Sequence, residues 1–259
     1  MSKNCLVVST YFGARRFRSD YPEAHRFSET LDDCIEWMGQ TLSHIKKLDS
    51  GVPMDIIIAN HDCRPDYDAD KKSLKFLSSI HNSEGVNGSV KVLNRDHGNG
   101  SGGSFKSFSF AFENFKNEYD YWFFLEDDVK LNVPMYFKHA IEQLEENKNV
   151  AYICCLGKDI GGVLSDPPAP KHCHGGIGCT HVKYLNEVFE TNKELPHSKH
   201  EQSGAENKSF YNSFELEGEV AFTNVYLELG YEIETLDVDK YYPNNNLKRG
   251  GVTSCHDFE

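Results

Sequence analysis

Short runs of consecutive apolar residues alternate along the chain with segments in which apolar residues recur at intervals of three and four. A run that is apolar at every position is typical of a strand buried on both faces, and the spaced pattern is typical of an amphipathic helix. Strands are predicted at residues 5–9, 54–59, 89–93, 121–125, 150–156 and 232–236. Helices are predicted at about residues 31–48, 71–80, 105–115, 132–147 and 181–190, and in a last segment that ends at Gly230.

The order of these elements predicts the fold class. Strand–helix–strand units joined in series form parallel sheets, and their crossovers are right-handed. We therefore expect an α/β fold with a mostly parallel central sheet flanked by helices. A chain of 259 residues is of ordinary to large size for one such domain.

The strand predicted at 121–125 leads directly into three carboxylates, Glu126, Asp127 and Asp128. Ligands of open α/β sheets bind beyond the carboxyl ends of the strands, so these acids stand where a site is expected. Carboxylate oxygens suit Mg²⁺ or Mn²⁺, and two or three of them can hold a metal that bridges a diphosphate. Taken alone, the pattern fits a solvated acidic turn equally well.

Two glycine-containing segments are candidates for close backbone contact with a ligand. Residues 94–104 are glycine-rich and precede the helix predicted at 105–115. Glycines before a helix N-terminus let backbone N–H groups approach an anion, although the spacing fits neither a P-loop nor a dinucleotide fingerprint, and a flexible linker is the alternative. Residues 172–179 combine His, Cys and Gly without a second pair at zinc-finger spacing, which favours backbone near a substrate over structural zinc.

Residues 191–208 are polar and interrupted by proline and glycine. This composition predicts a surface loop, and long loops in compact domains often serve as lids or substrate-binding elements.

Composition narrows the functional classes. The formal net charge of −13 excludes a protein that coats nucleic acid, because no basic stripe is present to neutralise phosphates. Eight cysteines are too few for a disulfide scaffold, and the adjacent Cys154 and Cys155 are typical of reduced core residues. The first residues do not form a signal peptide, and no apolar run approaches the length of a membrane span. A cytoplasmic protein is expected.

On these residues the chain resembles the GT-A-fold glycosyltransferases. The anchor is residues 125–129, of sequence LEDDV, with Pro134 shortly after, which is similar to the family's Asp-x-Asp metal motif in its Glu-Asp-Asp form. The resemblance covers most of the chain. It implies a single domain, with residues 1–130 as the nucleotide-binding half and residues 131–259 as the acceptor-binding half. It further implies Mn²⁺ or Mg²⁺, a nucleotide-diphosphate-sugar donor (a UDP-sugar is favoured), and a glycan or other hydroxyl acceptor.

The resemblance assigns the metal site. Asp128 is implied as the direct ligand, and Glu126 and Asp127 as residues that hold the ribose or a water of the metal shell. His256 is implied to complete that shell. Two basic side chains are implied to meet the diphosphate, Lys248 and Arg249.

The remaining implied residues contact the donor or the acceptor. Contacts to the donor are implied for Thr10, Asp62, Arg95, Gly103, Lys106, Gly175 and Gly176. Glu219 lies at the position of the catalytic base of inverting members, but the usual Glu-Asp pair is replaced by Gly218-Glu219, so Glu217 is a competing candidate. A carboxylate that takes the acceptor proton implies inversion at the anomeric carbon.

Two other classes compete with this interpretation. A sugar-nucleotide nucleotidyltransferase would have a glycine- and Arg/Lys-rich signature directly after the first strand, and residues 10–16 are a poor version of it. A non-catalytic carbohydrate-binding protein of the same fold is the other alternative, because fold alone does not establish function.

Overall fold

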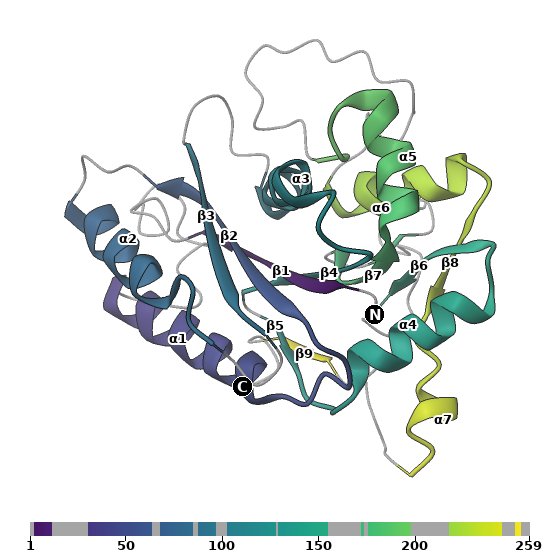
Figure 1. Cartoon of the computed structure of the whole chain (residues 1–259), viewed down its shortest axis with the longest axis horizontal. Helices are drawn as coiled ribbons and strands as arrows, with labels where there is room; N and C mark the ends of the chain where they lie inside the picture. Colours follow the sequence, from purple (N-terminus) through teal and green to yellow (C-terminus); the bar gives the residue numbers. More distant parts are fainter. Residues whose placement is uncertain are drawn as a thin grey trace, which may run out of the picture.

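A seven-stranded sheet crosses the middle of the molecule, and helices cover both of its faces (Figure 1). The computed structural model describes residues 3–11, 31–63, 68–84, 88–96, 103–127, 129–154, 172–173, 176–197, 218–244 and 252–254. The strands of this sheet are β1 (Asn4–Tyr11), β2 (Asp55–Cys63), β3 (Val90–Asp96), β4 (Tyr121–Glu126), β6 (Val150–Cys154), β7 (Gly178–His181) and β8 (Glu232–Thr235). The helices are α1 (Leu31–Lys47), α2 (Asp68–Ile80), α3 (Gly103–Phe115), α4 (Tyr136–Glu146), α5 (Val182–Asn192), α6 (Gly218–Glu228) and α7 (Val238–Tyr241).

The sheet has the strand order β3-β2-β1-β4-β7-β6-β8. Strand β7 is antiparallel to both β4 and β6, and the four other pairs are parallel. A second, two-stranded sheet pairs β5 (Val129–Leu131) with β9 (Val252–Ser254). The predicted α/β class, with a mostly parallel central sheet flanked by helices, is therefore confirmed.

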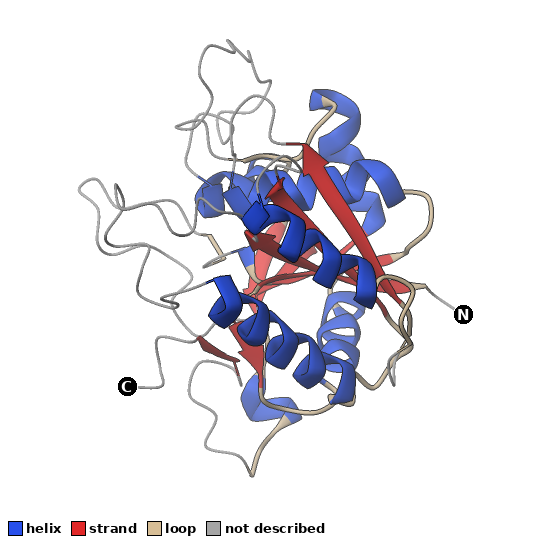
Figure 2. Cartoon of the chain, turned by 90° about the vertical axis from the view of Figure 1, so that its left-hand side faces the viewer, coloured by secondary structure: helices blue, strands red, loops and turns tan. Residues whose placement is uncertain are grey.

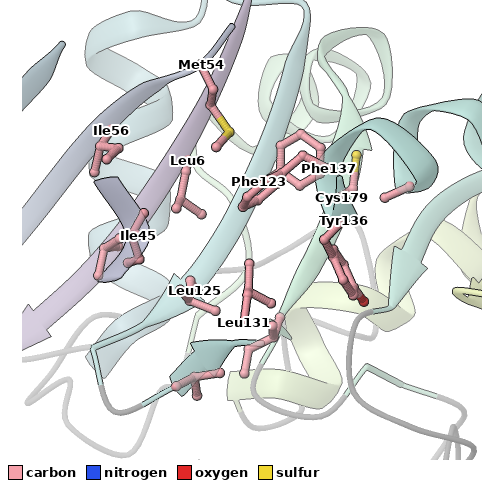
Figure 3. Close-up of a cluster of buried hydrophobic side chains, with 14 of the residues drawn as sticks. Leu6, Ile45, Met54, Ile56, Phe123, Leu125, Leu131, Tyr136, Phe137 and Cys179 are labelled. Atoms are coloured by element: carbon pink, nitrogen blue, oxygen red, sulfur yellow. The ribbon is translucent and has the colours of Figure 1, made fainter. Parts of the chain in front are cut away.

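Strand β4 shows why its sequence is an unbroken apolar run. Tyr121, Phe123 and Leu125 belong to an apolar cluster that includes residues of α1, α2 and α4, part of which is drawn in Figure 3. Trp122 and Phe124 belong to a second cluster, on the other face, with residues of α3, α5 and α6. Helices lie on either side of the strands (Figure 2). Burial of each large apolar side chain in this way stabilises the folded state by about 1.5–3 kcal/mol relative to an exposed side chain.

Several predicted boundaries were wrong; the strand predicted at 54–59, for example, extends to Cys63. Two further differences have a clear cause. The helix predicted from residue 132 begins at Tyr136, after Met135, which adopts a left-handed conformation with φ of 59° and provides no side-chain cap. The amide of Met135 instead donates to the carbonyl of Asp49, at 2.6 Å. Strand β3 extends to Asp96 because its last residues pair with β2, so Arg95 belongs to this strand and not to the glycine-rich segment.

Four short elements were not predicted, namely β5, β7, β9 and α7. Strand β7 begins at Gly178, where a Cβ atom would collide with the ring of Tyr152 and the carbonyl of Ile153 on β6. Gly178 therefore serves the close approach of two strands rather than a substrate.

The predicted end of α6 at Gly230 is confirmed. Gly230 has φ of +85°, its amide donates to the carbonyl of Leu227, and the amide of Tyr231 donates to that of Tyr226. These bonds form a Schellman motif, which satisfies carbonyls at the helix end. In the described ranges, no helix is long and apolar enough to cross a bilayer.

Candidate functional site

The chain reverses its direction of travel across the sheet at β1. Strands β2 and β3 follow on one side of β1, and β4 lies on the other side. In open α/β sheets, ligands bind outside the carboxyl ends of the strands at such a switch point. Ser9 of β1 is paired with Glu126 of β4, so the acids that follow β4 begin at this edge of the sheet.

Asp127 is fixed to the end of β1 by two hydrogen bonds. Its amide donates to the carbonyl of Ser9 at 3.1 Å, and its Oδ2 accepts a 2.7 Å bond from Oγ1 of Thr10. The Asp127 side chain is buried (6% exposed), as is that of Thr10 (1%). The structure thus brings together two predicted site residues that are 117 positions apart, as a direct pair.

Glu126 is directed to the opposite face of the sheet from Leu125, because side chains alternate along a strand. Trp122 and Phe124, its neighbours on that face, pack with α3 and α6. Glu126 is only partly buried. Glu126 and Asp127 therefore lie on different faces of the sheet, at the carboxyl end of β4.

A row of polar side chains continues across the carboxyl ends of β1, β2 and β3. Thr10 pairs with Asn60, and Asn60 pairs with Asn94. Asn60 is fully buried, and its Nδ2 donates to Oδ1 of Asn94 at 3.2 Å. Sequence reasoning missed both asparagines, although a polar residue inside an apolar strand was a usable signal. Arg95, the next residue of β3, is 9% exposed and lies at the same edge.

The pairing of β5 with β9 brings a segment from the end of the chain beside the acidic turn. Val129 is the antiparallel partner of Ser254, and Leu131 that of Val252. Asp128 and His256 lie outside the described residues, but they are close in sequence to this pairing.

Two glycines at the start of α6 and before β7 surround the ring of Phe105, in the first turn of α3. A Cβ atom on Gly176, which has φ of +61°, would lie 2.6 Å from Cε1 of this ring. A Cβ atom on Gly218 would lie 2.9 Å from its Cε2. The close approach at Gly176 is therefore to Phe105. The same packing fixes the first turn of α6, where Gly218 immediately precedes Glu219.

A cluster of three charged or titratable side chains, Lys106, Glu194 and His197, links α3 to the segment after α5. Nζ of Lys106 lies 2.7 Å from Oε2 of Glu194 and 3.2 Å from Nε2 of His197, which in turn lies 3.1 Å from Oε2 of Glu194. Burial raises the pKa of Glu194, but bonds from His197 and Lys106 outweigh it and lower the pKa from 4.5 to about 2. Glu194 is therefore a carboxylate at every pH near neutrality.

This segment corrects the first part of the surface loop predicted at 191–208; residues 198–208 lie outside the described ranges. Residues 191 and 192 complete α5, and Leu195 is fully buried. The amide of Leu195 donates to Oγ of Ser109 on α3, at 2.9 Å. Residues 193–197 are therefore packed onto α3, and sequence reasoning missed the cluster that they form with Lys106.

Three further predicted site residues are placed by their backbones. Gly103 is the first residue of α3, Asp62 belongs to β2 and Glu219 belongs to α6, and the structure does not describe the side chains of these two acids. Outside the described ranges lie Asp128, Gly175, Glu217, Lys248, Arg249 and His256. Within the part of the chain that is described, no three His, Cys, Asp or Glu side chains gather to hold a metal.

A cavity of about 380 Å³ opens at the opposite edge of the sheet, beside Asn4 and Tyr119. Several of its polar groups are paired with one another, although Oδ1 of Asn4 has no hydrogen-bond partner among the described residues. Asp55 accepts bonds from Ser89 and from the hydroxyl of Tyr119, and burial and this last bond raise the pKa of Tyr119. Lys91 pairs with Glu118 on its rim. This network is structural, and the chemistry is expected at the other edge.

The fold is similar to that of a mannosyltransferase from Pyrobaculum calidifontis in complex with GDP-Man and Mn²⁺. The two share 12% sequence identity with a TM-score of 0.51, over 90% of this chain and 54% of the mannosyltransferase chain. The present chain thus spans about half the length of that protein. No protein-family model matches the sequence, and no curated protein matches it. At 12% identity the likeness shows a common fold.

Proposed function

We propose that the chain is a metal-dependent glycosyltransferase, which moves a sugar from a nucleotide-diphosphate-sugar to an acceptor hydroxyl with inversion. The observation that carries this proposal is the pairing of β5 with β9 beside the acidic end of β4, at the switch point of the sheet. It is supported at a coarse level by the similar fold of a mannosyltransferase solved with GDP-Man and Mn²⁺.

The proposed metal ligands are Asp128 and His256. Asp128 is the residue before Val129, and His256 is the second residue after Ser254. Val129 and Ser254 are antiparallel partners. The residue that precedes Val129 and the residues that follow Ser254 therefore leave this pair on the same side. Consecutive Cα atoms are about 3.8 Å apart, which keeps His256 within about 8 Å of Ser254. A carboxylate and an imidazole are a donor set that fits Mn²⁺.

Other residues of the chain are proposed to bind the diphosphate and to take the acceptor proton. When bound, the metal would offset the charge that develops on the leaving diphosphate. Lys248 and Arg249, which precede β9, are proposed to meet the same diphosphate. Glu219 is proposed to take the proton of the acceptor hydroxyl, which requires reach to that hydroxyl more than an unusual pKa. Its place in the first turn of α6 stabilises a carboxylate, since the helix dipole favours negative charge there.

The donor contacts are proposed along one edge. Thr10, Asp62, Arg95 and Gly103 belong to β1, β2, β3 and the start of α3, each at or near the carboxyl end of the sheet. On this proposal residues 1–130 bind the nucleotide and residues 131–259 bind the acceptor. Glu126 and Asp127 are proposed to support the ribose or a metal-bound water.

The test is thermal unfolding of the protein with a panel of UDP- and GDP-sugars, with and without Mn²⁺. A donor at a hundred times its Kd stabilises the folded state by about 2.7 kcal/mol, so one member of the panel should raise the Tm only when Mn²⁺ is present. Asp128→Asn should abolish this shift and the Mn²⁺-dependent transfer. Full transfer by Asp128→Asn would refute the assignment. A shift without turnover would favour a non-catalytic carbohydrate-binding protein.

A further inference from the structure

The acidic turn and β5 are held by three polar side chains, of which only Thr10 already has a place in the proposed chemistry, as a donor contact. Thr10, at the end of β1, donates to Oδ2 of Asp127 at 2.7 Å. Thr41, on α1, donates to the backbone carbonyl of the same residue at 3.3 Å. His44, one turn further along α1, contacts the carbonyl of Leu131 with its Nε2 at 2.6 Å. A carbonyl oxygen only accepts, so Nε2 of His44 carries the proton.

We propose that Thr10, Thr41 and His44 form a positioning clamp for the metal site; this inference rests on the proposed function. The clamp holds residues 127–131 at both ends, with Asp127 at one end and Leu131 at the other. Asp128, the proposed metal ligand, lies between these two anchored positions in the sequence.

The first anchor fixes Asp127 at three of its polar atoms. Its amide is bonded to Ser9, its carbonyl to Thr41 and its carboxylate to Thr10. Because the peptide bond is planar, a fixed carbonyl at Asp127 also fixes the peptide plane that leads to Asp128. Asp127 therefore serves as the support on which its neighbour is oriented.

The second anchor, at Leu131, combines apolar packing with a hydrogen bond. Leu131 is 1% exposed and belongs to the same apolar cluster as Ile45 of α1, and both side chains are labelled in Figure 3. His44 adds a short hydrogen bond to the backbone of Leu131, next to this contact. Strand β5 also pairs with β9, so its position sets where the residues that follow Ser254 begin. The clamp thereby acts on both proposed metal ligands.

The clamp gives Thr10 a role that differs from a contact to the nucleoside. A positioning residue acts through the metal ligand, so its loss weakens binding of Mn²⁺ alone. A nucleoside contact would leave binding of Mn²⁺ alone unchanged and would weaken only nucleotide binding. Outer residues that orient metal ligands typically change metal affinity by about 10- to 100-fold.

Calorimetric titration of the full chain with Mn²⁺ alone tests the clamp, and the component that Asp128→Asn removes defines the site. Thr10→Val and His44→Ala should each lower this affinity by about 10-fold or more, and Thr10→Ser should restore it. The matched control is Thr180→Val on β7, since Thr180 is also fully buried and donates a 2.7 Å bond to a carbonyl, that of Ala151. Thr180→Val should lower the Tm comparably and leave Mn²⁺ affinity unchanged.

The outcomes separate the two proposals. A wild-type chain that shows no Asp128-dependent Mn²⁺ binding overturns the metal site and the clamp together. Wild-type binding that Thr10→Val and His44→Ala both retain overturns the clamp and leaves the proposed function standing. Equal losses in Thr10→Val and Thr180→Val also overturn the clamp, because the effect would then be one of stability alone.

Discussion

The cluster of Lys106, Glu194 and His197 makes stability depend on pH in a way that one substitution can reveal. Glu194→Gln keeps the size of the side chain and an acceptor oxygen but removes the charge. Glu194 is only 21% exposed, and it receives Lys106 at 2.7 Å and His197 at 3.1 Å. A neutral amide at this position therefore loses the attraction of both partners while the packing of the segment is preserved.

The magnitude follows from the pKa of Glu194. A fall of this pKa from 4.5 to about 2 corresponds to about 3.4 kcal/mol of folding stability before solvent screening is considered. Lys106 is 32% exposed, so solvent screens part of the attraction, and we expect about 1–2 kcal/mol near pH 7. A lowered pKa stabilises the folded state above the unfolded-state pKa. This contribution is present above about pH 4.5 and is lost as the pH falls toward 2.

Urea unfolding of wild type and Glu194→Gln, measured from pH 7 down to the lowest pH at which both fold, checks this reasoning. The free-energy difference between the two should be about 1–2 kcal/mol at pH 7 and should shrink below about pH 5. The control is Glu146→Gln, which removes a solvent-exposed pair with Lys240 and should cost clearly less than Glu194→Gln. A Glu194→Gln difference that stays constant with pH, or that matches Glu146→Gln, would refute the argument.

Two further predictions concern the base and the backbone. Glu219→Gln should lower transfer by about 10²- to 10⁴-fold with donor binding intact, and if only Glu217→Gln does so, the base is Glu217. Gly230→Ala should cost about 1–2 kcal/mol in urea unfolding, because its φ is +85° and nothing lies near the added methyl. Gly176→Ala should cost about 1–3 kcal/mol more, since its methyl meets the ring of Phe105 as well, and equal costs would contradict the role given to that ring.

The sequence predicted six of the seven strands of the large sheet, and the signal is clearest for those that are buried on both faces. Strand β4 is apolar at five successive positions, and each of those side chains is packed under a helix. Strands β5 and β9 have three residues each and no periodicity of their own. They exist because they pair with each other across more than a hundred residues, which no local pattern records.

The place of the acids in the sheet was predictable from the sequence, and the hydrogen bonds that hold them were not. The acids after β4 could be located because they follow a buried strand, and the fold places the start of this group at the switch point. The hydrogen bond from Thr10 to Asp127 depends on β1 and β4 becoming neighbours. The segment with Glu194 and His197 is a loop, as predicted, but its packing onto α3 was missed, because that packing depends on one apolar residue, Leu195.

The two described acids of the candidate site lie on opposite faces of the sheet. On the α1 face, Asp127 is bonded to Thr10 and Thr41, and this support bears on the metal. Glu126 lies on the face that α3 covers, and Lys106 of α3 is held by Glu194. Because neighbouring residues of a strand point to opposite faces, two consecutive acids of the chain reach both faces of the sheet. Substitutions on the α1 face should therefore change metal affinity.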